Sequence, residues 1–315
     1  MNLKGCELLL TKPRGFCAGV DRAIGIVNRA IEMFDEKIYV KHEVVHNKNV
    51  IEELTKKGVE FIESLEQVPD KSILIYSAHG VSKEVTDAAE KKELRIFDAT
   101  CPLVTKVHIE IHKYALSDTD VILIGHYGHP EVEGTMGQYN SNKGKIHLIE
   151  NIEDAKKLKI QNNKIAYVTQ TTLSVDDTKN IIDYIKIQYP KIMGPKKDDI
   201  CYATQNRQEA VKKILNYCDC LIVVGSQNSS NSQRLKEIAV QAGKSAYLID
   251  HESQLDISSL SNKKVIGITA GASAPEHTVQ SLIKYLIAEG AKISREQIEF
   301  KEEAVTFSLP KSLRS

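Results

Sequence analysis

The feature that most constrains the fold is a cysteine followed by two polar loops, a pattern that occurs three times along the chain. Cys17, Cys101 and Cys201 each stand between the end of a strand-like apolar run and the start of a helical pattern. Successive cysteines are 84 and 100 residues apart. A recurrence at this spacing indicates a repeated structural unit that is larger than one strand and one helix.

Each repeat places its two polar loops at similar distances from the cysteine. The first loop lies 29, 28 and 28 residues after the respective cysteine and contains His46, His129 and Ser229. The second loop lies 62, 70 and 72 residues after it and contains His79, Thr171 and Ser273. Because the order of these features is the same each time, we interpret the chain as three α/β units at 1–97, 98–198 and 199–315.

Alternation of strands and helices predicts an α/β fold with mainly parallel sheets. Strands are predicted at 6–11, 38–40, 72–76, 94–97, 121–125, 164–168, 220–225, 245–249 and 264–269. Helices are predicted at 20–34, 50–57, 177–188, 208–217, 232–242 and 276–289. Loops after parallel strands gather at the carboxyl edge of a sheet. We therefore expect the three units to pack about a pseudo-threefold axis, with the cysteines and polar loops at its centre.

Charge and composition exclude several classes of partner. The chain has 42 Lys and Arg residues and 42 Asp and Glu residues, so it lacks the basic surplus needed for general binding to nucleic acid or to an anionic membrane. No apolar run approaches the 18 residues or so of a membrane span. The first residues do not resemble a signal or transit peptide. We expect a cytoplasmic protein, a monomer or weak dimer, with reduced cysteines.

The three repeated cysteines predict a metal centre with one open position. A closed structural zinc site needs four ligands, commonly in closely spaced pairs, and these three cysteines contain no such pair. Cysteines are the usual ligands of iron–sulfur clusters, and three of them leave one iron of a cubane open. The alternative is that they are inert buried thiols. We interpret Cys6, Cys218 and Cys220, which have no counterparts in the repeats, as core residues.

The polar loops predict an anion site. Several of them run into helices, whose first N–H groups attract phosphate, and their histidines and hydroxyl groups add further donors. Neither a P-loop nor a dinucleotide-binding glycine motif is present. The alternative is that the serines only cap helices, as the spacings Ser174–Asp177, Ser230–Gln233 and Ser273–Glu276 also suggest.

A glycine-rich turn at 125–134 places His129 beside Glu131. If Glu131 is buried, its raised pKa suits a general acid, whereas a solvated loop carboxylate is the alternative. His126 and Glu133 flank this pair as weaker candidates. Thr171 and Thr172 are candidates for relaying a proton or binding a substrate hydroxyl, or they are ordinary residues at a strand end.

From about residue 14 to residue 310 the chain resembles the LytB family of 4-hydroxy-3-methylbut-2-enyl diphosphate reductases. The matching motifs lie at 14–20, 42–47, 78–82, 98–104, 128–131, 169–174, 225–232 and 271–275. The resemblance implies a trefoil of three α/β units around a [4Fe–4S] cluster, with a fourth iron open to substrate. It implies Cys17, Cys101 and Cys201 as cluster ligands, with Glu131 and Thr171 as the acid and its relay. It also implies a diphosphate and substrate site that comprises His46, His79, His129, Thr171, Thr172, Ser229, Ser230, Asn231 and Ser273.

The resemblance further implies a reductive dehydroxylation that yields isopentenyl and dimethylallyl diphosphate, the last step of the non-mevalonate isoprenoid pathway. Its electrons come from a flavodoxin or a ferredoxin-type donor. Two other functions stay open at this point. An iron–sulfur sensor needs the three cysteines but neither Glu131 nor the diphosphate loops. A zinc hydrolase built on His46, His79 and His129 leaves the three equivalent cysteines unexplained.

Overall fold

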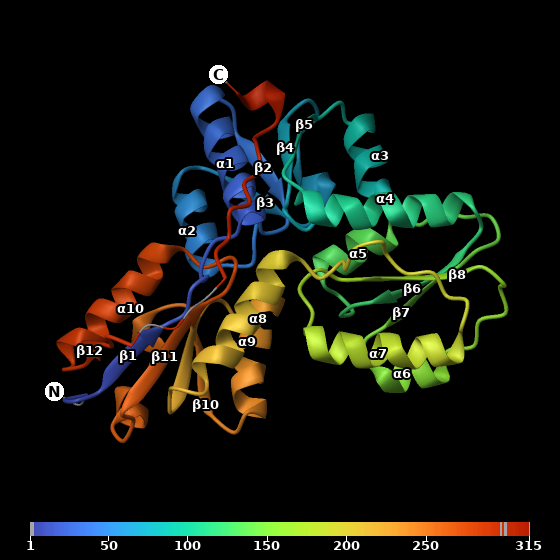
Figure 1. The fold of residues 1–315 in the computed structure, drawn as a ribbon. Coiled ribbons are helices and arrows are strands. Elements are labelled where there is room, and N and C mark those ends of the chain that lie inside the picture. The colour runs from blue at the N-terminus through green and yellow to red at the C-terminus, as the bar shows by residue number, and fades with distance from the viewer. Residues whose placement is uncertain (1–2, 297, 299–300, 315) are drawn as a thin grey trace. The chain divides into compact units, whose positions relative to one another are not determined.

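The computed structural model describes residues 3–296, 298 and 301–314 (Figure 1). Within these residues, three sheets alternate with helices along the chain, and every strand pairing between named strands is parallel. The predicted α/β class with parallel sheets is therefore confirmed. No helix in this part of the chain is long and apolar enough to cross a membrane.

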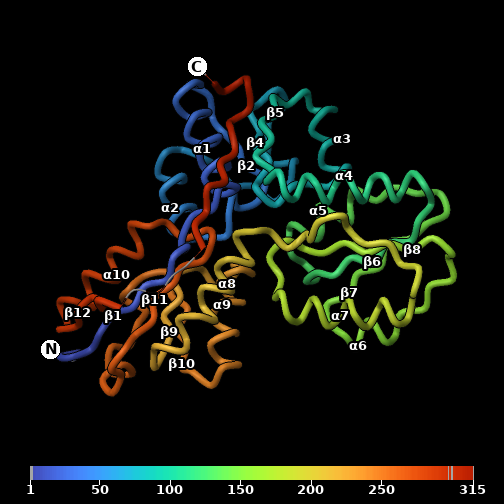
Figure 2. Tube along the Cα trace, in the orientation of Figure 1, coloured from blue at the N-terminus to red at the C-terminus, as the bar shows by residue number. Residues whose placement is uncertain are grey.

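By its internal contacts the chain divides into two compact units. Unit 1 comprises Met1–Ala18, His46–Glu52 and Tyr202–Thr306, and unit 2 comprises Gly19–Val45, Glu53–Cys201 and Phe307–Ser315. In unit 2 the carboxyl-terminal segment runs beside α1 (Ala18–Met33), as Figure 2 shows. There Arg22 and Arg29 donate to the carbonyl oxygens of Ser308 and Leu313. The predicted boundaries at 97 and 198 stay a prediction.

Unit 1 contains one sheet with helices on both faces. Its strand order is β10 (Ser245–Ile249), β9 (Cys220–Val224), β11 (Val265–Ala270), β1 (Glu7–Leu10) and β12 (Lys292–Ile293). Alternate residues of a strand point to opposite faces. Accordingly Ile222 packs with α10 (Glu276–Ala288), whereas Leu221 and Val223 pack with α8 (Tyr202–Ile214) and α9 (Ser230–Gln241).

Unit 2 contains two sheets. The first has the order β3 (Glu60–Ile62), β2 (Ile38–Lys41), β4 (Ile73–Tyr76) and β5 (Arg95–Asp98), and the second has the order β7 (Ile146–Ile149), β6 (Asp120–Ile124) and β8 (Ile165–Thr169). Its other helices are α2 (Lys48–Lys56, shared with unit 1), α3 (Lys83–Lys91), α4 (Pro102–Leu116), α5 (Pro130–Met136), α6 (Ile152–Lys157) and α7 (Val175–Gln188). In Figure 1, α4 and α7 lie on opposite faces of the second sheet. Val121 and Leu123 pack with α4, and Ile122 and Ile124 pack with α7.

The segment that leads into each cysteine pairs in parallel with a strand of a sheet. β1, which precedes Cys17, pairs with β11 and β12, and β5, which precedes Cys101, pairs with β4. Before Cys201, Met193 forms an isolated parallel bridge with Ala166 of β8. This pairing fixes where the chain leaves the sheet, so each cysteine segment begins from a defined position.

All nine predicted strands and all six predicted helices are present, with shifted ends. The sequence analysis missed β3, β7 and β12, which are two to four residues long. Helix α8 starts six residues before its predicted position. The residues of its first turns are polar yet buried, as Asn206 and Arg207 illustrate. Hydrophobic periodicity does not detect such a segment.

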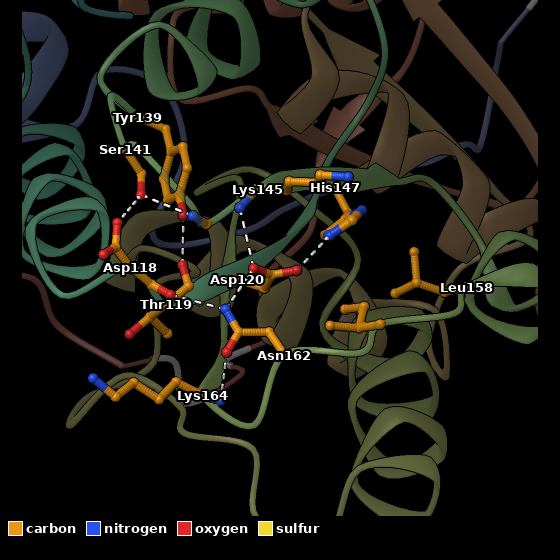
Figure 3. A network of polar contacts seen from close by, with 12 residues as sticks. Asp118, Thr119, Asp120, Tyr139, Ser141, Lys145, His147, Leu158, Asn162 and Lys164 are labelled. Carbon is orange, nitrogen blue, oxygen red and sulfur yellow. Dashed lines mark hydrogen bonds and ion pairs between the residues drawn. The ribbon is translucent and has the colours of Figure 1, made fainter.

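A polar network closes the amino ends of the second sheet of unit 2 (Figure 3). The Asp120 carboxylate accepts from the backbone N–H of Lys145 at 3.1 Å and from the Asn162 amide at 2.8 Å, and it lies 3.1 Å from His147 Nε2. The Asn162 amide also donates to the carbonyl oxygen of Asp118. This network joins the loops at that edge, opposite the edge that carries the predicted site.

The buried face of β6 yields a test of the fold. Ile122→Ala should lower the free energy of unfolding by about 2–5 kcal/mol, because it removes packed methyl groups from a fully buried position. Ile187→Ala, on an exposed part of α7, should change it by less than about 0.5 kcal/mol. Urea unfolding followed by circular dichroism measures both, and equal effects would contradict the packing described.

Candidate active site

The predicted site residues follow the carboxyl ends of strands, except Cys201, which follows the isolated bridge at Met193, and they fall into two sets. Unit 1 contains Cys17, His46, Ser229, Ser230, Asn231 and Ser273, and unit 2 contains His79, Cys101, His129, Glu131, Thr171, Thr172 and Cys201.

In unit 2, Glu131 is held by Thr171. The backbone N–H of Thr171 donates to Glu131 Oε1 at 2.6 Å, and the Thr171 hydroxyl donates to Oε2 at 3.0 Å. Glu131 is only 4% exposed in the first turn of α5. Burial raises the pKa of its carboxyl to about 7, although the two hydrogen bonds from Thr171 oppose the shift. A carboxyl with this pKa is suited to give up a proton near neutral pH.

Backbone contacts connect both cysteines of unit 2 to this acid. The N–H of Cys201 donates to the carbonyl oxygen of Thr171 at 3.0 Å, and the N–H of Cys101 donates to that of Ala78, next to His79, at 3.0 Å. The rings of His79 and His129 meet edge to face with their centroids 5.8 Å apart. His129 caps α5, and its Nδ1 accepts from the N–H of Glu131 at 3.1 Å. Unit 2 thus brings the two cysteines, the two histidines and the acid into one neighbourhood.

Thr172 takes a different role from Thr171. Its hydroxyl accepts from the side-chain amide nitrogen of Gln170 at 3.0 Å, and the side-chain oxygen of Gln170, Oε1, accepts from the backbone N–H of His126 at 3.0 Å. This bridge ties the loop after β8 to the glycine-rich turn after β6. Thr172 therefore stands beside the acid, in the loop that positions it.

A buried ion pair missing from the sequence analysis connects the two cysteine segments of unit 2. The Asp199 side chain is fully buried, and it pairs with Lys106 of α4 at 3.0 Å while accepting from the N–H of Thr169. Burial raises the pKa of Asp199 to about 6, and Lys106 opposes the shift. Because α4 starts directly after Cys101, the pair links it to the segment before Cys201. The available signal was an aspartate two residues before a predicted ligand.

In unit 1, the Cys17 loop lies on the loop that follows β11. The N–H of Cys17 donates to the carbonyl oxygen of Ala272 at 3.2 Å. The Ser273 hydroxyl donates to the carbonyl oxygen of His46 at 2.9 Å, so it joins the first and second polar loops. These contacts collect Cys17, His46 and Ser273 around one end of the sheet.

Arg207, which the sequence analysis also missed, holds the Cys17 loop in place through hydrogen bonds. Its fully buried guanidinium donates to the carbonyl oxygens of Gly15, at 2.7 and 3.2 Å, and Phe16, at 3.3 Å, and it pairs with Glu303 at 3.0 Å. Gly15 has a φ of +70°, a conformation that favours glycine. A buried arginine in a polar helical turn carries no recognisable pattern in a single sequence.

The capping predictions are partly wrong. Ser174 caps α7, as its spacing predicts, by accepting from the N–H of Asp177. Ser229 rather than Ser230 caps α9, because the helix starts one residue earlier than the spacing suggested, and Ser229 accepts from the N–H of Ser232 at 3.3 Å. Ser273 does not cap α10, because its hydroxyl is used by His46 and Pro275 takes the cap position.

Asn231, in the first turn of α9, is the most unusual polar residue of unit 1. Its side chain is 3% exposed, and within the described residues neither of its polar side-chain atoms has a hydrogen-bond partner. Buried amides are normally hydrogen-bonded, so this amide points to a ligand. Gly271 lets the loop after β11 approach this helix, since a Cβ there would lie 2.0 Å from the Ser232 hydroxyl oxygen.

The cysteines separate into two chemical groups. Cys6, Cys218 and Cys220 are buried, and burial raises the pKa of each thiol, to about 12 for Cys220. A thiol of that kind stays protonated and is a poor metal ligand. Cys17, Cys101 and Cys201 are only partly buried and form no disulfide.

The partly buried cysteines have the chemistry of cluster ligands. They form no disulfide, and cysteine thiolates are the usual ligands of iron–sulfur clusters. Among the described residues, no three His, Cys, Asp or Glu side chains are grouped to hold one metal ion. The type of donor therefore fits an iron–sulfur cluster.

Comparisons with known proteins point to one family over nearly the full length. The family model described as "LytB protein" matches residues 8–287. The 4-hydroxy-3-methylbut-2-enyl diphosphate reductases of Acinetobacter baumannii and Methylococcus capsulatus are 57% and 55% identical, each over 98% of both chains. The solved structure of the E-1-hydroxy-2-methyl-but-2-enyl-4-diphosphate reductase from Plasmodium falciparum is 41% identical with a TM-score of 0.92, over 98% of this chain and 96% of that one.

Burial of Glu131 predicts a specific dependence of stability on pH. Its folded pKa of about 7 exceeds the ordinary value of 4.5, so the folded protein binds more protons than the unfolded chain between these values. The stabilisation is complete below about pH 4 and is lost as the pH rises through about 7, with a slope of up to about 1.4 kcal/mol per pH unit. Glu131→Gln should remove this component.

Urea unfolding of both proteins at several pH values measures the difference between them. The contribution of Asp199, which has the same sign, is present in both proteins and cancels from that difference. A difference that stays constant between pH 5 and pH 8 would contradict a buried, protonated Glu131.

Proposed function

Because the chain belongs to the LytB protein family, we propose that it is a 4-hydroxy-3-methylbut-2-enyl diphosphate reductase. The reaction consumes two electrons and two protons, breaks the bond from carbon to the terminal hydroxyl and releases that oxygen as water. Its products are isopentenyl and dimethylallyl diphosphate. The observation that carries the proposal is the buried Glu131–Thr171 pair, one backbone hydrogen bond from Cys201.

Cys17, Cys101 and Cys201 hold a [4Fe–4S] cluster in this proposal. When bound, the cluster would supply low-potential electrons and a Lewis acid for the substrate hydroxyl. The partial burial of these thiols supports the assignment, in contrast to the raised pKa of the three core cysteines. Lys106–Asp199 and Arg207 keep the ligand segments in place from outside.

Glu131 delivers the proton that turns the leaving hydroxyl into water. A hydroxide ion is a poor leaving group, so protonation as the bond breaks lowers the barrier. The raised pKa keeps Glu131 protonated near neutral pH, and Thr171 fixes the orientation of both carboxyl oxygens. Thr171 is also the relay through which the proton can reach the substrate.

The diphosphate is held by short side chains and helix ends rather than by a P-loop. Asn231 supplies a buried amide, and the N-terminus of α9 supplies a positive dipole end. His46, His79, His129, Thr172, Ser229, Ser230 and Ser273 complete the proposed substrate site. The binding energy of the diphosphate, remote from the reacting carbon, positions the hydroxyl.

Replacing the acid tests the proposed mechanism. Glu131→Gln should keep the visible spectrum and iron content of the cluster but lower turnover of the allylic diphosphate by about 10²–10⁴-fold, the usual contribution of a general acid. Glu153→Gln, at an exposed position of α6, should retain wild-type turnover. Activity is measured without oxygen, with reduced methyl viologen as the electron source. Full turnover of Glu131→Gln would remove Glu131 as the acid.

Iron content tests the ligand assignment. Cys101→Ala should lose most of its iron after anaerobic reconstitution, because two thiolates hold a cluster poorly. Cys220→Ala is the matched control, since it removes a thiol that lies in the core of unit 1. It should bind as much iron as the wild type. Wild-type iron content in Cys101→Ala would contradict the assignment.

A further inference from the structure

A hollow in unit 2 lies against the peptide that carries Cys101. Its volume is about 440 Å³, and its lining includes Thr100 and Pro102, the residues on either side of Cys101. The proposed reaction needs two electrons, and the residues of the chain do not supply them. An electron that reaches this hollow from outside is one residue from a proposed cluster ligand.

We propose that this hollow is the docking surface for a small acidic protein that carries one electron at a time. The inference rests on the proposed function, because only an enzyme that consumes electrons needs such a partner. It names the place on this chain where the partner binds.

Hydrogen bonds from Arg22 hold the walls of the hollow in place. Arg22 of α1 donates to the carbonyl oxygens of Thr100 at 3.0 Å, Asp98 at 3.2 Å and Ser308 at 3.2 Å. These bonds tie the cysteine loop to the carboxyl-terminal segment, which adds Pro310 and Ser312 to the lining. The surface is therefore preformed, which reduces the entropy lost when a partner binds.

The charge of the hollow favours an acidic partner. Two basic residues, Arg22 and Lys106, and one acidic residue, Asp98, line the hollow. A third basic residue, the exposed Lys311, lies in the sequence between the lining residues Pro310 and Ser312. Asp199 compensates the charge of Lys106, but the partners of Arg22 are neutral carbonyl groups. Since the chain as a whole has no net charge, this surplus is local. Complementary charge steers association and sets orientation.

An apolar contact lies beside these charges. Ile109 of α4 lines the hollow and is 50% exposed. An exposed branched side chain next to basic groups suits an interface with an apolar centre and a charged rim. Ile109 and Lys311 therefore offer two independent positions at which the surface can be tested.

A second hollow in unit 2 separates the effect of charge from the effect of position. It measures about 840 Å³ and is lined by four lysines together with Asp118 and Asp120. It lies at the amino ends of β6, β7 and β8, around the network of Figure 3. His129, Glu131 and Thr171 follow the opposite ends of β6 and β8. Its lysines also attract acidic proteins, but an electron carrier bound there lies at the amino ends of the strands and not beside the Cys101 segment.

The experiment measures binding of two oxidised probes to the iron-loaded enzyme by calorimetry at low ionic strength. The probes are an acidic [2Fe–2S] ferredoxin and an acidic flavodoxin. Lys311→Glu and Ile109→Glu should each raise the Kd of at least one probe by about fivefold or more, and higher salt should weaken wild-type binding. Lys159→Glu, in the second hollow, makes the same charge change as Lys311→Glu and should leave that Kd unchanged.

Turnover with two electron sources completes the test. With reduced methyl viologen, the two variants of the docking surface should stay within twofold of the wild type, whereas turnover with the reduced carrier should fall in step with binding. Failure of both probes to bind, an unchanged Kd in both variants, or an equal effect of Lys159→Glu would overturn the docking surface. Absence of viologen-driven turnover in the wild type would instead overturn the proposed function.

Discussion

Parallel pairing of the segments that precede the three cysteines is the constraint on which the rest of the structure depends. β1 beside β11 and β5 beside β4 fix the points from which the Cys17 and Cys101 segments leave their sheets, and the bridge at Met193 does so for Cys201. Backbone hydrogen bonds then hold each cysteine to a neighbouring polar loop, at Ala272, Ala78 and Thr171. The cysteines and loops are thus positioned by main-chain hydrogen bonds, to which the Arg207 side chain and the Lys106–Asp199 pair add support.

The chemistry of the site comes from burial, which changes the pKa of different side chains with different consequences. Burial keeps the Cys220 thiol protonated and inert, but it makes the Glu131 carboxyl an acid that is protonated near neutral pH. The difference lies in the surroundings, because Glu131 retains Thr171 as a partner for both oxygens. The same principle applies to Asn231, whose buried amide has no partner within the described part of unit 1 and is available to a ligand.

Much of the fold could be predicted from the sequence, and candidate site residues could be singled out, because both steps use local patterns. Alternating apolar runs predicted the long strands, and the threefold recurrence singled out Cys17, Cys101 and Cys201. Arg207 was out of reach, since its partner Gly15 is 192 residues away and its polar side chain is buried. The position of Asp199 gave a signal, but its pairing with Lys106, 93 residues away, did not. β12 was missed because two residues form no period, and Ser273 was misassigned because capping spacing ignores tertiary partners.

The most direct test of the account is the conversion catalysed by the wild-type protein. The iron-loaded enzyme receives 4-hydroxy-3-methylbut-2-enyl diphosphate and reduced viologen without oxygen, and NMR follows the products. The account predicts isopentenyl and dimethylallyl diphosphate, with two electrons consumed for each molecule of substrate. A protein that keeps its cluster and leaves the substrate intact would contradict it.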